Sequence, residues 1–201
     1  MVVTGLIYAF VLAVVGGGLA WMTGFPLAGA PFYLLALFCL WFFRDPEREI
    51  PGGPVAVSPA DGKVVRIRRR PEGTQVCIFL NVFDVHVNRA PIAGKVIAVD
   101  YTPGKFLVAS KDEASYENER NTMTVEGGQS TVRFAQIAGL IARRIVCTKK
   151  AGDYVTMGER VGLIKFGSRV DVDLGPEWEV TVQEGQRVSA GSSVIAKRKE
   201  P

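Results

Sequence analysis

The chain has 201 residues, of which 48% are hydrophobic, and its formal net charge is +4. This length allows one domain of ordinary size and a small additional segment. The basic excess is too weak to indicate a nucleic-acid-binding protein, and three cysteines without a CxxC pair exclude a disulfide scaffold. We therefore expect a protein of a reducing compartment with no nucleic-acid partner.

The first 43 residues contain no Asp, Glu, Lys, Arg or His. Two apolar stretches, 4–22 and 27–43, are separated by Gly24 and Pro26, which would interrupt a continuous helix. As helices they would be about 28 and 25 Å long, close to the roughly 30 Å hydrocarbon core of a bilayer. The pattern predicts an N-terminal α-helical membrane hairpin. A buried core hairpin is the alternative, and a cleaved signal peptide is disfavoured because no basic residue precedes the first stretch.

Two arginines, Arg44 and Arg48, follow the second apolar stretch, whereas the loop between the stretches has no basic residue. Because positive charge is retained on the inner side, we expect residues 44–201 to be cytoplasmic, at the cell (inner) membrane. An even number of crossings would put Met1 on the same side. The predicted organisation is a membrane hairpin with an interfacial linker over residues 1–50, and a second domain over residues 51–201.

The second domain consists of short β-branched runs separated by Gly, Pro and Asp, and no long helical periodicity competes with them. This pattern predicts a mostly β domain, either a sandwich or a barrel. The polar stretch Lys111–Asn121 is predicted to be a loop or a short helix. Examples of the predicted strands are Lys63–Ile67, Gln75–Leu80, Lys95–Asp100, Thr131–Ala135, Val161–Phe166, Val170–Leu174 and Glu179–Val182.

A weak internal repeat relates residues 152–158 (GDYVTMG) to residues 185–191 (GQRVSAG). Its G-x-x-V-x-x-G pattern places glycines at turns and a valine on a core face, as in the hammerhead strands of lipoyl- and biotinyl-carrier domains. This similarity supports an alternative function, a non-catalytic membrane-anchored carrier or adaptor. Carrier domains present a lysine at an exposed hairpin, however, and the corresponding hairpin here carries residues 166–169 (FGSR).

The only histidine, His86, excludes any site that needs several imidazoles, and we predict no metal site. His86 lies in an alternating stretch that would put it on one strand face with Asp84 and Asn88. It could be a general base or, equally, a solvent-facing strand histidine. Read by local chemistry alone, Asp61 is a turn residue before a strand, and Gly167-Ser168 is a hairpin turn.

Five motifs occur along the chain: FFRDPER at 42–48, SPADGKV at 58–64, FDVHVNRAP at 83–91 with Gly94 after it, ENER at 117–120 and GERVGLIKFGSRVDV at 158–172. Taken together, they resemble the short (bacterial and archaeal) form of the phosphatidylserine decarboxylase proenzymes. The resemblance runs from about Phe42 to Leu174, and the motifs come in the family's order. Arg169 departs from several family members, which carry Thr or Ser after the serine of the cleavage site.

The resemblance implies a catalytic triad of Asp61, His86 and Ser168 and a self-cleavage between Gly167 and Ser168. His86 would take the proton of the Ser168 hydroxyl, Asp61 would orient the imidazole, and the hydroxyl would attack the Gly167 carbonyl. The resulting ester would be eliminated, leaving Ser168 as a pyruvoyl group, the covalent cofactor. The products would be a large subunit, 1–167, and a small subunit, 168–201, and we expect the cut to lie between strands of one sheet so that the two subunits stay paired.

The resemblance further implies decarboxylation of phosphatidylserine to phosphatidylethanolamine through a Schiff base between the pyruvoyl group and the substrate amine. The partners would be the phospholipid substrate, the membrane and the chain's own two subunits, and a homodimer stays open. Ether-linked archaetidylserine is not distinguished from the diacyl lipid. Candidates for binding the substrate phosphate are Arg44, Arg48, Arg89 and Lys105, each of which could equally be a solvated or interfacial charge.

Two further alternatives stay open at this point. The chain could be a relative of the decarboxylases that has lost processing, although Asp61, His86 and Ser168 are all present. Cleavage could also occur at the other Gly-Ser sequence, Gly191-Ser192, which would leave a shorter C-terminal fragment.

Overall fold

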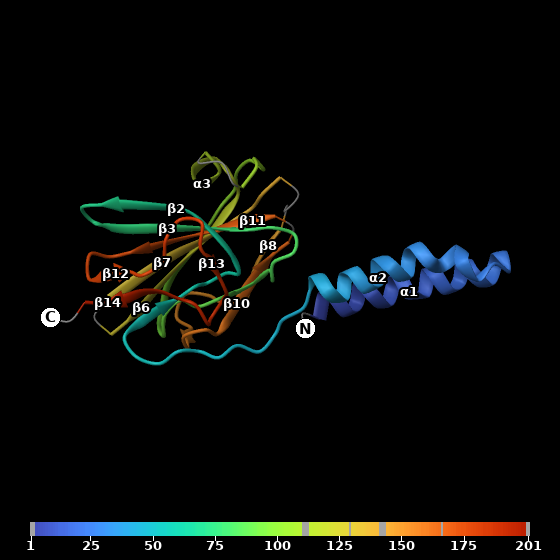
Figure 1. The fold of residues 1–201 in the computed structure, drawn as a ribbon, viewed down its shortest axis with the longest axis horizontal. Coiled ribbons are helices and arrows are strands. Elements are labelled where there is room, and N and C mark those ends of the chain that lie inside the picture. Colours follow the sequence, from blue (N-terminus) through green and yellow to red (C-terminus); the bar gives the residue numbers. More distant parts are fainter. Residues whose placement is uncertain (1–2, 110–112, 129, 141–143, 166, 200–201) are drawn as a thin grey trace. The chain divides into compact units, whose positions relative to one another are not determined.

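The computed structural model describes residues 3–109, 113–128, 130–140, 144–165 and 167–199. Phe166, at the end of one predicted strand, and residues 111–112, at the start of the predicted loop, lie outside the described residues. The chain forms two compact units, Met1–Glu47 and Arg48–Pro201. Figure 1 shows the first as a pair of helices and the second as a domain of strands.

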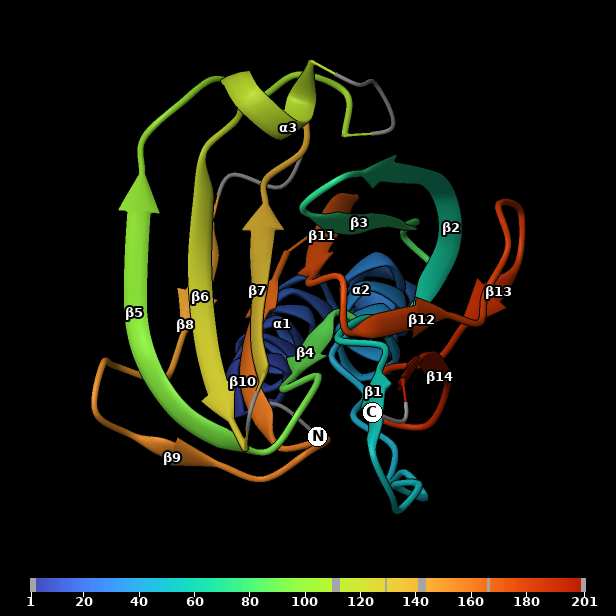
Figure 2. The same cartoon turned by 90° about the vertical axis from the view of Figure 1, so that its left-hand side faces the viewer.

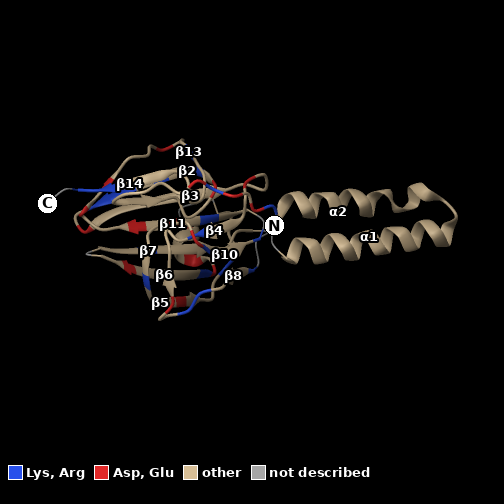
Figure 3. Cartoon of the chain, turned by 90° about the horizontal axis from the view of Figure 1, so that it is seen from below, with Lys and Arg blue, Asp and Glu red and all other residues tan. Residues whose placement is uncertain are grey.

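The first unit is a pair of apolar helices, α1 (Val3–Thr23) and α2 (Ala30–Phe42), joined through a short 3-10 helix, η1 (Pro26–Gly29). The backbones approach closely where two glycines meet, because a Cβ on Gly29 would lie 2.5 Å from the carbonyl oxygen of Gly16. Neither helix carries a charged residue (Figure 3). Among the described residues, α1 is the one helix long and apolar enough to cross a membrane, and α2 is shorter than the predicted stretch.

The second unit is mostly β, as predicted, and the described helix α3 (Ala114–Glu117) falls inside the stretch predicted as loop or short helix. Each predicted strand coincides with an observed strand over most of its length, except Glu179–Val182, of which only residues 179–180 are in a strand. Seven of the fourteen strands in the described residues are not among the runs named above, including Arg120–Gly127, whose start overlaps that polar stretch. The strands are β1 (Val55–Val57), β2 (Gly62–Arg70), β3 (Gly73–Leu80), β4 (Val87–Arg89), β5 (Gly94–Thr102), β6 (Arg120–Gly127), β7 (Ser130–Ile137), β8 (Ile145–Cys147), β9 (Tyr154–Val155), β10 (Arg160–Ile164), β11 (Ser168–Leu174), β12 (Trp178–Val180), β13 (Arg187–Val188) and β14 (Val194–Arg198).

An antiparallel eight-stranded sheet in the order β13-β2-β3-β11-β7-β6-β5-β9 dominates the domain. Figure 2 shows it curling from β5 through β7 to β2. One face packs on the core, where Val76, Val172, Phe134 and Met123 form a buried row across four neighbouring strands. Two three-stranded sheets, β1-β14-β12 and β4-β10-β8, complete the domain. The alternation of apolar and polar residues along β11 therefore separates a core face from a polar face.

The polar face of the sheet carries a hydrogen-bonded ladder across four strands. Arg68 Nη1 donates to Gln75 Oε1 at 2.9 Å, and Gln75 Nε2 donates to Asp173 Oδ1 at 2.8 Å. Arg133 Nε reaches the other oxygen of the Asp173 carboxylate at 3.2 Å. The ladder links β2, β3, β11 and β7, and such cross-strand pairs favour one register over its alternatives.

The same backbone arrangement occurs twice in the domain. Residues 58–64 pair with 185–191, and residues 90–96 pair with 152–158. Asp61 in the first copy has Ala93 as its counterpart in the second. The backbone hydrogen bonds of the two copies match, so the carboxylate of Asp61 is a group that the first copy carries and the second lacks. The matching bonds run from Gly191 N–H to Ser58 O (2.8 Å) and Gly158 N–H to Ala90 O (2.9 Å), and from Gly185 N–H to Val64 O (2.7 Å) and Gly152 N–H to Val96 O (2.8 Å).

Strands β10 and β11 are consecutive in the described chain but belong to two different sheets. Strand β10 pairs with β4 and β8, whereas β11 pairs with β3 and β7. A hairpin requires consecutive strands to pair with each other, and here both edges of each strand are occupied by other partners. The predicted hairpin turn at Gly167-Ser168, and the expectation that this bond lies between strands of one sheet, are therefore wrong.

Candidate active site

Ser168 is the first residue of β11 and is fully buried. It pairs with Leu80, the last residue of β3, while Arg169 pairs with Ile137, the last residue of β7. Because β3 and β7 both run antiparallel to β11, the loops that follow them leave the sheet at the end where β11 begins. The topology therefore gathers loops from distant parts of the sequence around Ser168.

The bond before Ser168 has an unusual environment. Gly167 has φ +57°, a left-handed backbone conformation that residues other than glycine rarely adopt. A Cβ at this position would meet nothing within 4 Å. Backbone geometry rather than space therefore favours glycine at this position. The Oγ atom of Ser168 is buried and has no hydrogen-bond partner among the described residues. An unsatisfied buried hydroxyl is costly and points to a functional role.

His86 lies just before β4 and is bound to the segment that leads to Ser168. Its carbonyl oxygen accepts a hydrogen bond from the Ile164 N–H at 3.3 Å, and its side chain is buried. The Nδ1 atom lies 2.8 Å from the carbonyl oxygen of Asp84. Because a carbonyl oxygen can only accept, Nδ1 carries the proton, and the neutral ring then has its lone pair on Nε2. That tautomer leaves Nε2 as the basic atom.

The loop that carries His86 is held by the side chain of Asp84. The Asp84 carboxylate accepts from the Asn81 N–H at 2.9 Å and forms an ion pair with Arg187 of β13. The Asn81 side chain in turn accepts from the Phe83 N–H at 2.7 Å. Asp84 thus lies in a turn formed by these side-chain bonds, and His86 precedes β4. The predicted alternating strand through residues 84, 86 and 88 is therefore wrong at residues 84 and 86 and holds only for Asn88.

Asp61 follows Ala60 in the turn before β2, and its carboxylate is largely buried. It accepts from Arg48 Nη2 through both oxygens, at 3.0 and 2.8 Å, and from the Ala190 N–H at 2.7 Å. The structure therefore surrounds Asp61 with donors from the linker and from the segment after β13. The ring nitrogen Nδ1 of His86, which Asp61 was expected to orient, is met by the Asp84 carbonyl.

The residues predicted to bind phosphate have partners within the chain. Arg48 holds Asp61, and the buried Arg89 donates to the Gly158 carbonyl oxygen at 3.0 Å. The exposed Lys105 pairs with Glu117 at 2.8 Å. Arg44, in the first unit, lies 4.3 Å from the centre of the Trp41 ring. For Arg48 and Arg89, these contacts favour a role in holding the frame of the site.

Two loops next to Ser168 are tied together by Asn118 of the ENER motif. Its side-chain amide is buried and exchanges two hydrogen bonds with the backbone of Leu107, at 2.8 and 2.9 Å, and donates to the Ala138 carbonyl oxygen at 2.7 Å. Gly139, which follows Ala138, lies close to the peptide bond between Gly167 and Ser168. A Cβ on Gly139 would be 1.9 Å from the Gly167 carbonyl oxygen. Sequence reasoning missed Gly139, because only the fold brings it beside Gly167.

A buried charged pair lies on the opposite face of β11. Arg169 Nε donates to Asp171 Oδ1 at 2.6 Å, and Ser115 Oγ of α3 donates to the other Asp171 oxygen at 2.8 Å. The neighbouring strand β3 places Cys77 opposite Asp171. Burial, and next the negative charge of Asp171, raise the pKa of the Cys77 thiol to about 12, although Arg169 acts in the opposite direction. Cys77 is therefore a neutral core residue.

These features describe a β domain in which a buried serine hydroxyl follows a glycine of left-handed φ at one strand end, with a buried histidine hydrogen-bonded to the strand that precedes it. Such an arrangement is typical of an enzyme site. A family model described as phosphatidylserine decarboxylase matches residues 35–196. The phosphatidylserine decarboxylase proenzyme of Solibacter usitatus is 63% identical over 98% of this chain and 97% of its own length. That of Nitratidesulfovibrio vulgaris is 51% identical over 85% of this chain and 82% of its own length. That of Chlorobium chlorochromatii is 47% identical over 88% of this chain and 84% of its own length. The chain belongs to the phosphatidylserine decarboxylase family.

The raised pKa of Cys77 predicts resistance to alkylation. At pH 8 a thiol of pKa about 12 is ionised on the order of once in ten thousand molecules, and the thiol is also buried. Iodoacetamide should therefore modify the half-exposed Cys147 in the folded protein and leave Cys77 unmodified until denaturant is added. Peptide mass spectrometry measures both sites, and rapid labelling of Cys77 in the folded protein would contradict this environment.

Proposed function

We propose that this chain decarboxylates phosphatidylserine to phosphatidylethanolamine after cutting itself between Gly167 and Ser168. Family membership and the proenzyme names of its relatives support the reaction and the processing. The observation that carries the proposal is the buried, unsatisfied hydroxyl of Ser168 directly after a left-handed glycine. A hydroxyl in that place can act on its own backbone and does not take part in structural hydrogen bonding.

In the proposed cleavage, Nε2 of His86 takes the proton of Ser168 Oγ, which attacks the carbonyl carbon of Gly167. The peptide C–N bond breaks, the nitrogen gains a proton, and the acyl group is left on Oγ as an ester. Removal of the Ser168 α-proton then expels the ester oxygens as the new carboxylate of Gly167. Water replaces the nitrogen, which leaves as ammonia, and a ketone remains at the start of the small fragment.

The environment of Ser168 fits the resulting pyruvoyl group. Position 168 is buried on the core side of β11, where a small uncharged ketone can be accommodated without an unpaired charge. The ketone would be held in position because residue 168 is paired with Leu80 of β3. The group supplies an electron sink when substrate carbon dioxide is lost. His86 Nε2 would return a proton to the product. Asp61 stays a proposed member of the triad, but its carboxylate is bonded to Arg48 Nη2 and the Ala190 N–H, while the carbonyl oxygen of Asp84 occupies the Nδ1 side of the His86 ring.

The helical unit supports a proposed location at the cell membrane, with the β domain in the cytoplasm. Helix α1 is long enough to span a bilayer, and the side chains of Phe10, Trp21 and Leu34 project from the helical unit with most of their surface exposed. A lipid substrate keeps its acyl chains in the bilayer, so an anchored enzyme would not need to extract it. The basic residues Arg44 and Arg48 follow α2 on the proposed inner side.

The twofold backbone arrangement supports a proposed likeness to the hammerhead repeats of lipoyl-carrier domains. It gives less support to the alternative function of a carrier. A carrier needs an exposed lysine at the tip of a hairpin, and the corresponding segment here leads into the buried Ser168 and joins two sheets.

Replacing Ser168 with alanine should abolish processing. We expect wild-type protein to yield chains of residues 1–167 and 168–201, and Ser168→Ala to remain one chain, because no hydroxyl is left to attack Gly167. Intact-mass measurement of both purified proteins decides this. Ser192→Ala, at the other Gly-Ser sequence, is the matched control and should be cut as the wild type is; cleavage at Gly191 would contradict the proposed site.

A side chain at Gly139 should obstruct the reaction at Gly167. The new Cβ of Gly139→Ala would lie 1.9 Å from the Gly167 carbonyl oxygen, so one of the two segments must move. Since a displacement of about 1 Å can cost roughly a hundredfold in rate, we expect cleavage to slow by about that factor. A time course of cleavage by mass spectrometry measures the rate. Gly52→Ala, whose Cβ meets nothing within 4 Å, is the control, and equal rates for the two variants would refute the obstruction.

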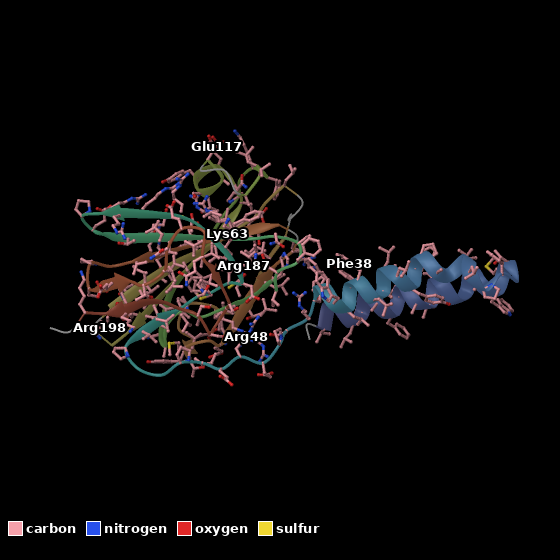
Figure 4. The ribbon with its side chains drawn as sticks, in the orientation of Figure 1. Phe38, Arg48, Lys63, Glu117, Arg187 and Arg198 are labelled. Atoms are coloured by element: carbon pink, nitrogen blue, oxygen red, sulfur yellow. The ribbon has the colours of Figure 1, made fainter. Side chains whose placement is uncertain are left out.

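The ion pair between Arg187 and Asp84 should set the position of His86. Figure 4 shows Arg187 beside Lys63, its pairing partner on β2. Arg187→Met removes the partner of the buried Asp84 carboxylate and loosens the loop, so we expect cleavage to slow by about tenfold at pH 7. Arg187→Lys should restore part of the rate, whereas Lys63→Met should have no effect. An unchanged rate in Arg187→Met, measured in the same time course, would argue against this positioning role.

A further inference from the structure

Four large apolar side chains project into solvent from the loops around Ser168. Val82, Phe83, Val108 and Leu140 have 37%, 68%, 43% and 57% of their surface exposed, and we refer to them as the apolar rim. Tyrosines apart, Phe83 and Leu140 are the two most exposed large hydrophobic side chains in the described part of the β domain. Single exposed apolar residues are normal on a protein surface, but a group around one site indicates an interaction surface.

The topology of the sheet explains why the rim surrounds the site. Val82 and Phe83 follow Leu80, the residue that pairs with Ser168, and Leu140 follows Ile137, which pairs with Arg169. Val108 belongs to the loop that Asn118 ties to Ala138. In addition, a Cβ on Gly139 would lie 3.2 Å from the Cβ of Ala109, so the loop that carries Leu140 contacts the loop that carries Val108.

The exposure of Phe83 is built into a fixed turn. The backbone N–H of Phe83 donates to Asn81, and the Asp84 carboxylate binds both the Asn81 N–H and Arg187. These bonds fix the backbone on both sides of Phe83, at a position where most of its side chain is exposed. Presenting an apolar ring to water from a fixed turn is unfavourable unless another apolar surface covers it.

Basic residues accompany the rim at the same end of the domain. The Lys165 N–H donates to the Arg144 carbonyl oxygen at 3.4 Å, which joins the segment after β10 to the segment before β8. Lys165 lies two residues before Gly167, and Arg144 is exposed. Cationic side chains beside apolar ones are suited to a bilayer surface that contains anionic lipid headgroups.

We propose that the apolar rim inserts into the surface of an anionic phospholipid bilayer and brings Ser168 to the level of the headgroups. This inference rests on the proposed function for the identity of the substrate. A lipid could then offer its headgroup to the site while its acyl chains remain beside Phe83 and Leu140 in the bilayer. The rim would therefore act on substrates held in a membrane and be dispensable for the same headgroup in water.

The test compares two substrates in the full-length protein carrying Phe83→Ser and Leu140→Ser, reconstituted in nanodiscs. Intact mass first establishes that the double variant is cut as the wild type is. We expect carbon dioxide release from long-chain phosphatidylserine in the nanodisc to fall about tenfold or more, because less apolar area enters the bilayer. Release from a dibutyryl analogue dissolved in water should stay unchanged. Tyr154→Ser, which alters an exposed side chain of β9 at the other end of the sheet, is the matched control and should leave both rates unchanged.

Equal losses on both substrates, or no loss on the membrane lipid, would overturn the proposal. A photoreactive benzophenone amino acid at position 83 gives a second measurement, which does not depend on rates. It should crosslink to lipid on irradiation, whereas the same group at position 154 should not, and crosslinking at position 83 only to a second copy of the chain would also overturn the proposal. Wild-type protein that neither cuts itself nor releases carbon dioxide from either lipid would instead refute the proposed function.

Discussion

Strand β11 is hydrogen-bonded along both edges, to β3 from Ser168 to Leu174 and to β7 from Arg169 to Leu174. The pairing begins at the residue that follows the proposed cut, so breaking the bond before Ser168 would remove no bond of the sheet. Strand β13 is paired with β2, and β14 is paired with β1. A fragment that starts at Ser168 would therefore stay in the domain, with Ser168 paired to β3 and the next residue, Arg169, paired to both β3 and β7.

The position of β11 also determines what surrounds its first residue. Its core face puts Ser168 against apolar side chains, and its other face carries the buried Arg169–Asp171 pair, which α3 covers through Ser115. Removing one member of such a pair would leave an uncompensated buried charge, which is strongly destabilising, so the pair fixes this end of the strand. The loops after β3 and β7 leave the sheet at the same point and bring the His86 turn and Gly139 to it. One sheet position thus accounts for the place of the proposed base, the close contact of Gly139 and much of the apolar rim.

Much of this architecture is predictable from sequence, because it depends on local patterns. The absence of charge and the interrupting Gly24 and Pro26 predicted the two apolar helices, and β-branched runs predicted half of the strands, including β11. The roles of Ser168, His86 and Asp61 came from resemblance, because each has an ordinary local interpretation as a turn or strand residue. Contacts between distant segments were not predictable. The Asp84 carbonyl at His86, the Arg48–Asp61 pair and Gly139 beside Gly167 all depend on tertiary pairing, and β10 and β11 look like a hairpin until their other partners are known.

The central claim is that the hydroxyl of Ser168 is consumed to make a ketone at a new chain end within an intact sheet. Its most direct measurement is the mass of the C-terminal fragment of catalytically active protein, before and after reduction with borohydride. We predict a fragment beginning at position 168 that is lighter by one ammonia than the same peptide with a serine, and that gains two hydrogens on reduction. Active enzyme whose residue 168 is an unmodified serine, free or still joined to Gly167, would contradict the account.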